Sequence, residues 1–130
     1  MEAGNRSEKY KQQKDYTKAV SEFNKIINAD DKVAQNAYYH LGESYINLNK
    51  KQEALNAFRT ASNMIYDVKI QEDAALNYAK LSYEVGNVYK SVPEVLNDFL
   101  EKYPNSPHKE HIENLLIDSY ITSKNYKEAL

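Results

Sequence analysis

Small and aromatic side chains recur at a fixed interval along this chain of 130 residues. Three residues are each followed, 35 positions later, by a residue of the same type; the pairs are Tyr10 and Tyr45, Ala19 and Ala54, and Phe23 and Phe58. The same pattern returns near the end, 75 positions further on, at Tyr120 and Ala129. One more unit therefore fits between the second and the last. Such a period predicts stacked units, because one short unit cannot bury its apolar surface alone.

Each unit is predicted to be a pair of α-helices. The chain has only 3 glycines and 3 prolines and is rich in helix-forming residues. In the segment 16–29, apolar residues recur at the spacing of an amphipathic helix. Small residues such as Gly42 would let two helices approach closely, and large ones such as Phe58 would fill the space beside the crossing.

The local signals predict seven helices and the start of an eighth, over residues 2–14, 16–29, 33–48, 51–66, 72–85, 91–102, 108–123 and from 126 onward. Asp30-Asp31 is expected to end the second helix, 67–71 to form a long connection, and Gly86-Asn87 to end the fifth helix. Ser91 is the expected N-cap of the sixth helix, with proline in its first turn and Tyr103-Pro104 at its end. Because the eighth helix has no length in which to pair, we expect the chain to be a piece of a longer protein.

The second unit resembles the tetratricopeptide repeat family. Tyr38-x2-Leu41-Gly42-x2-Tyr45-x8-Ala54-x3-Phe58-x2-Ala61 follows the family pattern at nearly every defining position, with Tyr38 where tryptophan is usual. The segments 14–19 and 124–129 look like the family's turn and second-helix start. The resemblance implies an all-α, right-handed α-solenoid of antiparallel helix pairs, with about seven helices and a truncated eighth. The implied repeats cover approximately residues 1–34, 35–70, 71–107 and 108–130, in one domain.

By the same resemblance, the helix over 33–48 lines a concave groove. The residues expected there to bind a partner are Asn36, Tyr39, His40, Glu43, Ile46 and Asn47. For His40, a packing or simply exposed histidine is an equally good interpretation. We expect Tyr39 and Tyr83 to be partly exposed. The implied function is a non-catalytic scaffold that binds a peptide or partner protein.

Catalytic and metal-binding patterns are missing from the sequence. His108, Glu110 and His111 form the one cluster of metal-ligand types, but a fourth ligand is not evident, so solvated polar residues are the favoured interpretation. The chain has no cysteine, no glycine-rich phosphate loop and no Gly-x-Ser-x-Gly motif. We therefore expect no enzyme activity, no cofactor and no metal.

Charge and hydropathy exclude two further classes of partner. A formal net charge of -2, with dispersed basic residues, argues against nucleic acid. Membrane insertion is not expected, since no apolar run approaches the roughly 18 residues of a spanning helix. The segment 103–107 resembles the stop between repeats in bacterial periplasmic members of the family. This favours the bacterial periplasm or cell envelope over the cytoplasm, and it leaves an alternative function, as spacer or assembly repeats of a larger envelope protein.

Overall fold

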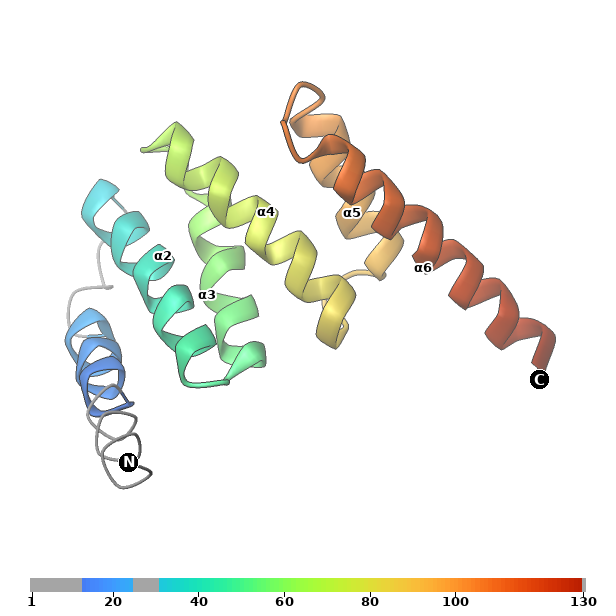
Figure 1. Cartoon of the computed structure of the whole chain (residues 1–130). Helices are drawn as coiled ribbons and strands as arrows, with labels where there is room; N and C mark the ends of the chain where they lie inside the picture. Colours follow the sequence, from blue (N-terminus) through green and yellow to red (C-terminus); the bar gives the residue numbers. More distant parts are fainter. Residues whose placement is uncertain (1–12, 25–30, 130) are drawn as a thin grey trace, which may run out of the picture. The chain divides into compact units, whose positions relative to one another are not determined.

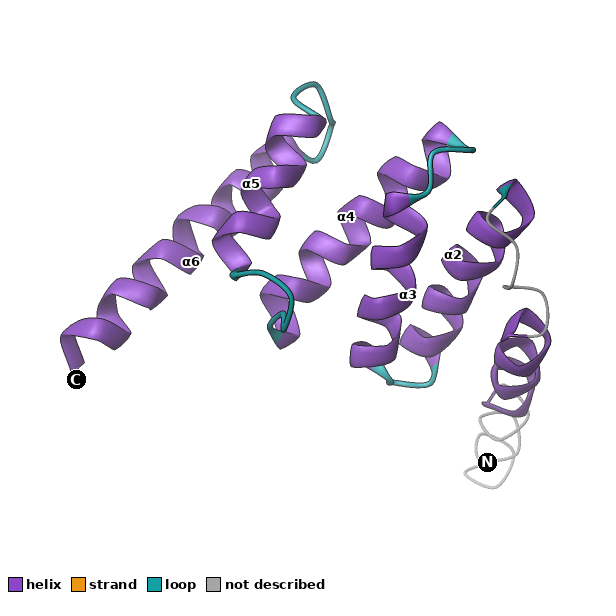
Figure 2. Ribbon diagram, turned by 180° about the vertical axis from the view of Figure 1, so that it is seen from behind, coloured by secondary structure: helices purple, strands orange, loops and turns teal. Residues whose placement is uncertain are grey.

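The computed structural model describes residues 13–24 and 31–129, with 123–129 described by their backbone alone. Every regular element in those ranges is an α-helix, and Figure 2 shows no strand among them. The chain divides into two compact units, Met1–Ala74 and Ala75–Leu130. The all-helical prediction is confirmed for the described residues.

The first unit contains the helical segment 13–24, α2 (Lys32–Asn47), α3 (Lys51–Asn63) and the start of α4 (Val68–Val85). Helices α2 and α3 lie side by side as an antiparallel pair (Figure 1). Asp31 begins α2, because its side chain accepts a hydrogen bond of 2.9 Å from the backbone N–H of Ala34. Asp31 therefore caps the start of α2, whereas residues 25–30, which include the predicted end of the preceding helix, lie outside the described residues.

Helices α2 and α3 pack closely at Gly42. A Cβ atom built on Gly42 would lie only 2.7 Å from the ring carbon Cζ of Phe58, which is fully buried. The core of this pair is otherwise made of small and aliphatic side chains: Ala34, Ala37, Leu41, Ala54, Leu55, Ala57 and Ala61. The predicted pairing of a small residue with a large one at the crossing is confirmed, and it explains why α2 and α3 can approach so closely.

A buried amide fixes the end of α3. Gln35, on α2, has no exposed surface. Its Nε2 donates to the carbonyl of Met64 at 2.5 Å and to that of Ala61 at 3.2 Å, while its Oε1 accepts from the backbone N–H of Asp67 at 2.7 Å. Carbonyl groups at a helix C-terminus lack partners within the helix. Gln35 supplies a partner for two of the carbonyls at this end and joins α2 to the connection between α3 and α4.

The second unit contains the rest of α4, α5 (Val92–Lys102) and α6 (Lys109–Ala129). Its core consists of Leu76, Ala79, Val95, Leu96, Phe99 and Ile112. The predicted limits of α5 are confirmed: Ser91 accepts from the backbone N–H of Glu94 at 3.3 Å, and Pro93 lies in the first turn. Gly86 follows α4 with a φ of +84°, a left-handed conformation that glycine adopts readily.

The connection between α3 and α4 covers residues 64–67, so it comes earlier than the predicted 67–71 and is one residue shorter, and the predicted end of the helix at 66 is wrong. Helix α3 ends at Asn63 and α4 already begins at Val68, so residues 68–71 are helical. The Asp67 side chain accepts from the backbone N–H groups of Lys69 and Ile70, both at 3.1 Å. The aspartate therefore starts a helix where the sequence suggested a long loop.

Two predicted helix breaks are absent. Residues 13–24 form one continuous helix through the expected turn at 14–16, and α6 continues through the expected turn at 124–125. The described residues thus form six helices, not seven and a truncated eighth; most of the predicted first helix lies outside them. Neither turn contains glycine or proline, and Lys, Asp and Asn cost a helix only about 0.7 kcal/mol each or less. A turn-like pattern without a breaker does not interrupt the backbone hydrogen bonds.

Candidate functional site: the exposed face of α2

The six residues predicted to bind a partner share one side of α2. They are Asn36, Tyr39, His40, Glu43, Ile46 and Asn47, spaced three or four positions apart or adjacent, as residues on one helix face are. Tyr39 is half-buried, and the other five are exposed. The six include no lysine and no arginine, and Glu43 is the one acidic residue among them.

Tyr39 connects this face to α4. Its ring packs edge-on against Phe58, with 5.7 Å between the ring centroids, and its hydroxyl donates a hydrogen bond to the carboxylate of Asp73. Burial, together with Asp73, raises the pKa of the Tyr39 hydroxyl well above its usual range. The prediction that Tyr39 is partly exposed is confirmed. Its side chain also packs against Phe58 on α3 and bonds to Asp73 on α4.

Local contacts order the polar groups of the face. The His40 ring stacks on Phe23 of the helical segment 13–24, with centroids 5.9 Å apart, and its Nδ1 lies 2.8 Å from Oε1 of Glu43. The Asn47 amide donates to the backbone carbonyl of Glu43 at 2.9 Å. The ring of His40 thus packs on an aromatic neighbour while the side chain stays about half exposed, as the second interpretation of this residue expects.

A second tyrosine–aspartate pair lies in the second unit. The hydroxyl of Tyr83, on α4, donates to the carboxylate of Asp118, on α6. This bond raises the pKa of the Tyr83 hydroxyl. The partners are 35 residues apart, and those of the pair Tyr39–Asp73 are 34 apart, so the contact recurs at about the period of the sequence repeat. Tyr83 is 38% exposed, which confirms the prediction for this residue.

Beside Tyr83 lies a hollow that sequence reasoning missed. Its volume is about 730 Å³, and it is lined by Tyr83, Glu84, Val92, Pro93, Asp118, Ser119 and Thr122. These residues come from the end of α4, the start of α5 and the middle of α6. No motif in the sequence joins them; the one available signal was Tyr83, expected to be partly exposed.

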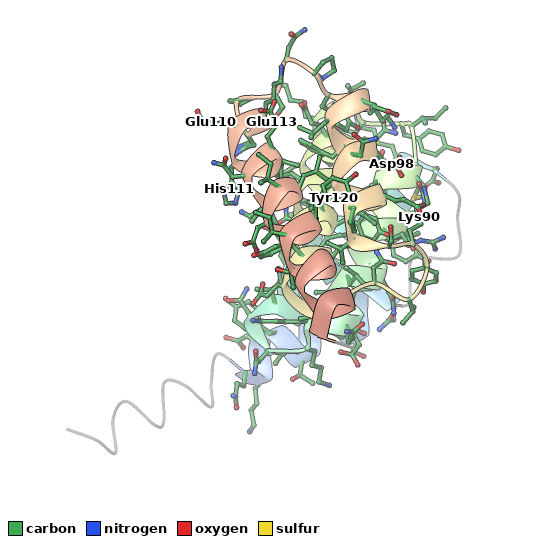
Figure 3. The ribbon with its side chains drawn as sticks, turned by 90° about the vertical axis from the view of Figure 1, so that its right-hand side faces the viewer. Lys90, Asp98, Glu110, His111, Glu113 and Tyr120 are labelled. Carbon is green, nitrogen blue, oxygen red and sulfur yellow. The ribbon has the colours of Figure 1, made fainter. Side chains whose placement is uncertain are left out.

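The remaining candidates do not form a site. His108, Glu110 and His111 are all exposed at the start of α6, where Figure 3 labels the last two. Within the described part of the chain, no three His, Asp or Glu side chains are close enough to hold a metal ion. None of the helices described is long and apolar enough to cross a membrane.

Comparison with known proteins identifies one segment. Residues 35–66 match the model of the tetratricopeptide repeat family. The match begins at Gln35, includes the Gly42–Phe58 crossing and covers most of α2 and all of α3. No curated protein and no solved structure matches the chain. The match supports the resemblance to the tetratricopeptide repeat family that the sequence suggested. Repeats of this family generally mediate protein–protein interaction and are typically non-enzymatic.

Proposed function

We propose that this chain is a non-catalytic interaction scaffold that binds a peptide or partner protein through the exposed face of α2. The residues of the contact are Asn36, Tyr39, His40, Glu43, Ile46 and Asn47. The observation that carries the proposal is that α2 belongs to the segment matching an interaction repeat. The surface of α2 outside the α2–α3 core carries accessible polar groups together with the exposed aliphatic residues Val33 and Ile46.

The chemistry of this face suits a peptide. The amides of Asn36 and Asn47 can donate to and accept from a peptide backbone. Ile46, which is 39% exposed, offers apolar surface beside them. Contacts with neighbouring helices fix the positions of the Tyr39 and His40 rings in the unbound protein. Ordering in advance lowers the entropy lost on binding, so a face of modest size can still bind selectively.

The test is a binding measurement on charge-reversal variants. A partner peptide is first selected from a displayed random-peptide library, and its affinity is then measured by calorimetry. Glu43→Lys should weaken binding about tenfold or more, since it reverses the charge of the face and removes the partner of His40. Asp15→Lys, at an exposed position on the helical segment 13–24, makes the same change in charge and should leave the affinity unchanged.

If Glu43→Lys and an Asn36→Ala/Asn47→Ala double variant both bind as tightly as the wild type, the α2 face is not the binding surface. That result would favour the alternative proposal, spacer or assembly repeats in a larger bacterial cell-envelope protein.

A further inference from the structure

The hollow in the second unit combines an apolar floor with an acidic wall. The ring of Tyr83 and the side chains of Val92 and Pro93 provide apolar surface. Glu84 and Asp118 provide two carboxylates, and none of the lining residues whose side chains the structure describes is a lysine, arginine or histidine. A volume of about 730 Å³ falls within the usual range of ligand pockets.

The hydrogen bond from Tyr83 fixes the acidic wall. The Tyr83 hydroxyl donates to Oδ2 of Asp118, which restrains the carboxylate at the edge of the hollow. A restrained carboxylate loses less side-chain freedom when it meets a cation than a mobile one does. Lys90, which lies shortly before α5, pairs with an acid outside the hollow, because its Nζ lies 2.9 Å from Oδ2 of Asp98. Figure 3 shows Lys90 and Asp98 close together.

We propose that this hollow is a second peptide-binding site, selective for a segment that carries an aliphatic side chain next to lysine or arginine. The aliphatic side chain of the peptide would be buried against the apolar surface of Val92 and Pro93, which removes it from contact with water. The neighbouring cation would lie against Asp118 and Glu84, an attraction that acidic partners would not share. The hollow belongs entirely to the second unit, whereas the α2 face belongs to the first, so the two sites can be tested separately.

The probe is a fluorescein-labelled heptapeptide with a central leucine between two arginines. Two matched peptides replace both arginines by glutamate, or the leucine by glycine. Binding to the full chain is followed by fluorescence anisotropy, and the site is located by amide chemical-shift changes in ¹⁵N-labelled protein. The arginine–leucine peptide should bind most tightly, weaken as salt is raised, and shift the amides of Ser119 and Thr122.

Neutral variants test the acidic wall. Glu84→Gln combined with Asp118→Asn removes both charges, and the new side chains keep oxygens that can accept hydrogen bonds, including the one from Tyr83. This double variant should bind the probe about 3- to 10-fold more weakly, as expected for two partly exposed charge pairs. The control, Glu101→Gln with Glu110→Gln, removes two exposed acids outside the hollow and should bind as the wild type does.

A substitution that fills the hollow gives an independent check. Thr122→Arg, at an exposed position of α6, adds both bulk and a positive charge and should abolish the shifts at Ser119. The proposal is overturned if the three peptides bind equally, if the probe does not bind, if the double variant binds as tightly as its control, or if the shifts fall on the α2 face. The last outcome would leave the proposed function of α2 standing.

Discussion

Tyr39 on α2 donates a hydrogen bond to Asp73 on α4, across a sequence separation of 34 residues. The contact joins the half-buried edge of the candidate binding face to α4, and Tyr83 on α4 bears the same relation to Asp118 on α6 in the second unit. In both pairs a tyrosine bonds to an aspartate about one repeat later. The tyrosines therefore serve both packing and polar contact between helices, and several predictions about stability depend on them.

Removing the Tyr39 hydroxyl should destabilise the first unit modestly. Tyr39→Phe keeps the ring contact with Phe58 but deletes the bond to Asp73. The expected loss is about 1 kcal/mol in the free energy of unfolding, measured by urea denaturation. Asp73→Asn, which keeps an acceptor for the hydroxyl, should cost less. Equal losses for the two variants would show that the negative charge, not the hydrogen bond, matters.

The same tyrosine should make stability depend on alkaline pH. Its pKa is raised in the folded protein, so the folded state favours the neutral hydroxyl. This contribution is complete below the unfolded pKa of about 10 and is lost as pH rises toward the folded value. Unfolding between pH 8 and pH 11 should show a decline that is smaller in Tyr39→Phe than in the wild type. Tyr66→Phe, at an exposed tyrosine, is the control and should show the wild-type decline.

Gly42→Ala should destabilise the α2–α3 pair by about 1–3 kcal/mol, because the added methyl group would overlap the buried ring of Phe58. A double-mutant cycle in thermal unfolding tests this cause. In a Phe58→Leu background, the cost of Gly42→Ala should fall by about 1 kcal/mol, since the smaller side chain leaves room. If the two changes were simply additive, the account of the crossing would be wrong.

Gln35→Ala should destabilise the C-terminal end of α3. It leaves the carbonyls of Ala61 and Met64 and the N–H of Asp67 without this partner, at a cost of about 1–3 kcal/mol. Hydrogen exchange of the Asp67 amide should accelerate more than that of the Ala54 amide, which bonds to the backbone of Lys50. Acceleration of both amides by the same factor would indicate global destabilisation instead.

The sequence predicted those elements whose limits depend on local chemistry. Helix α5 begins at its serine cap and proline and ends before Tyr103-Pro104, as expected. Where no glycine or proline was present, as at 14–16 and 124–125, a resemblance to a turn was not enough to break a helix. The start of α4 was missed because Asp67 was not recognised as a helix cap.

That the candidate residues share one face of α2 was easier to predict than the contacts that they make. Helical periodicity alone places Asn36, Glu43 and Asn47 on one side of α2. The bond between Tyr39 and Asp73, the buried position of Gln35 and the hollow beside Tyr83 all join residues from separate helices. Such contacts depend on how the helices pack, which the repeat pattern specifies only at its small and aromatic positions.

The most direct test of the central claim is an amide chemical-shift map of the ¹⁵N-labelled chain with a peptide selected for binding to it. The proposed function predicts that the largest changes fall on the exposed face of α2, between Asn36 and Asn47, and that Glu43→Lys requires about tenfold more peptide, or still more, to produce them. Tight binding whose shifts leave that face unchanged would contradict it.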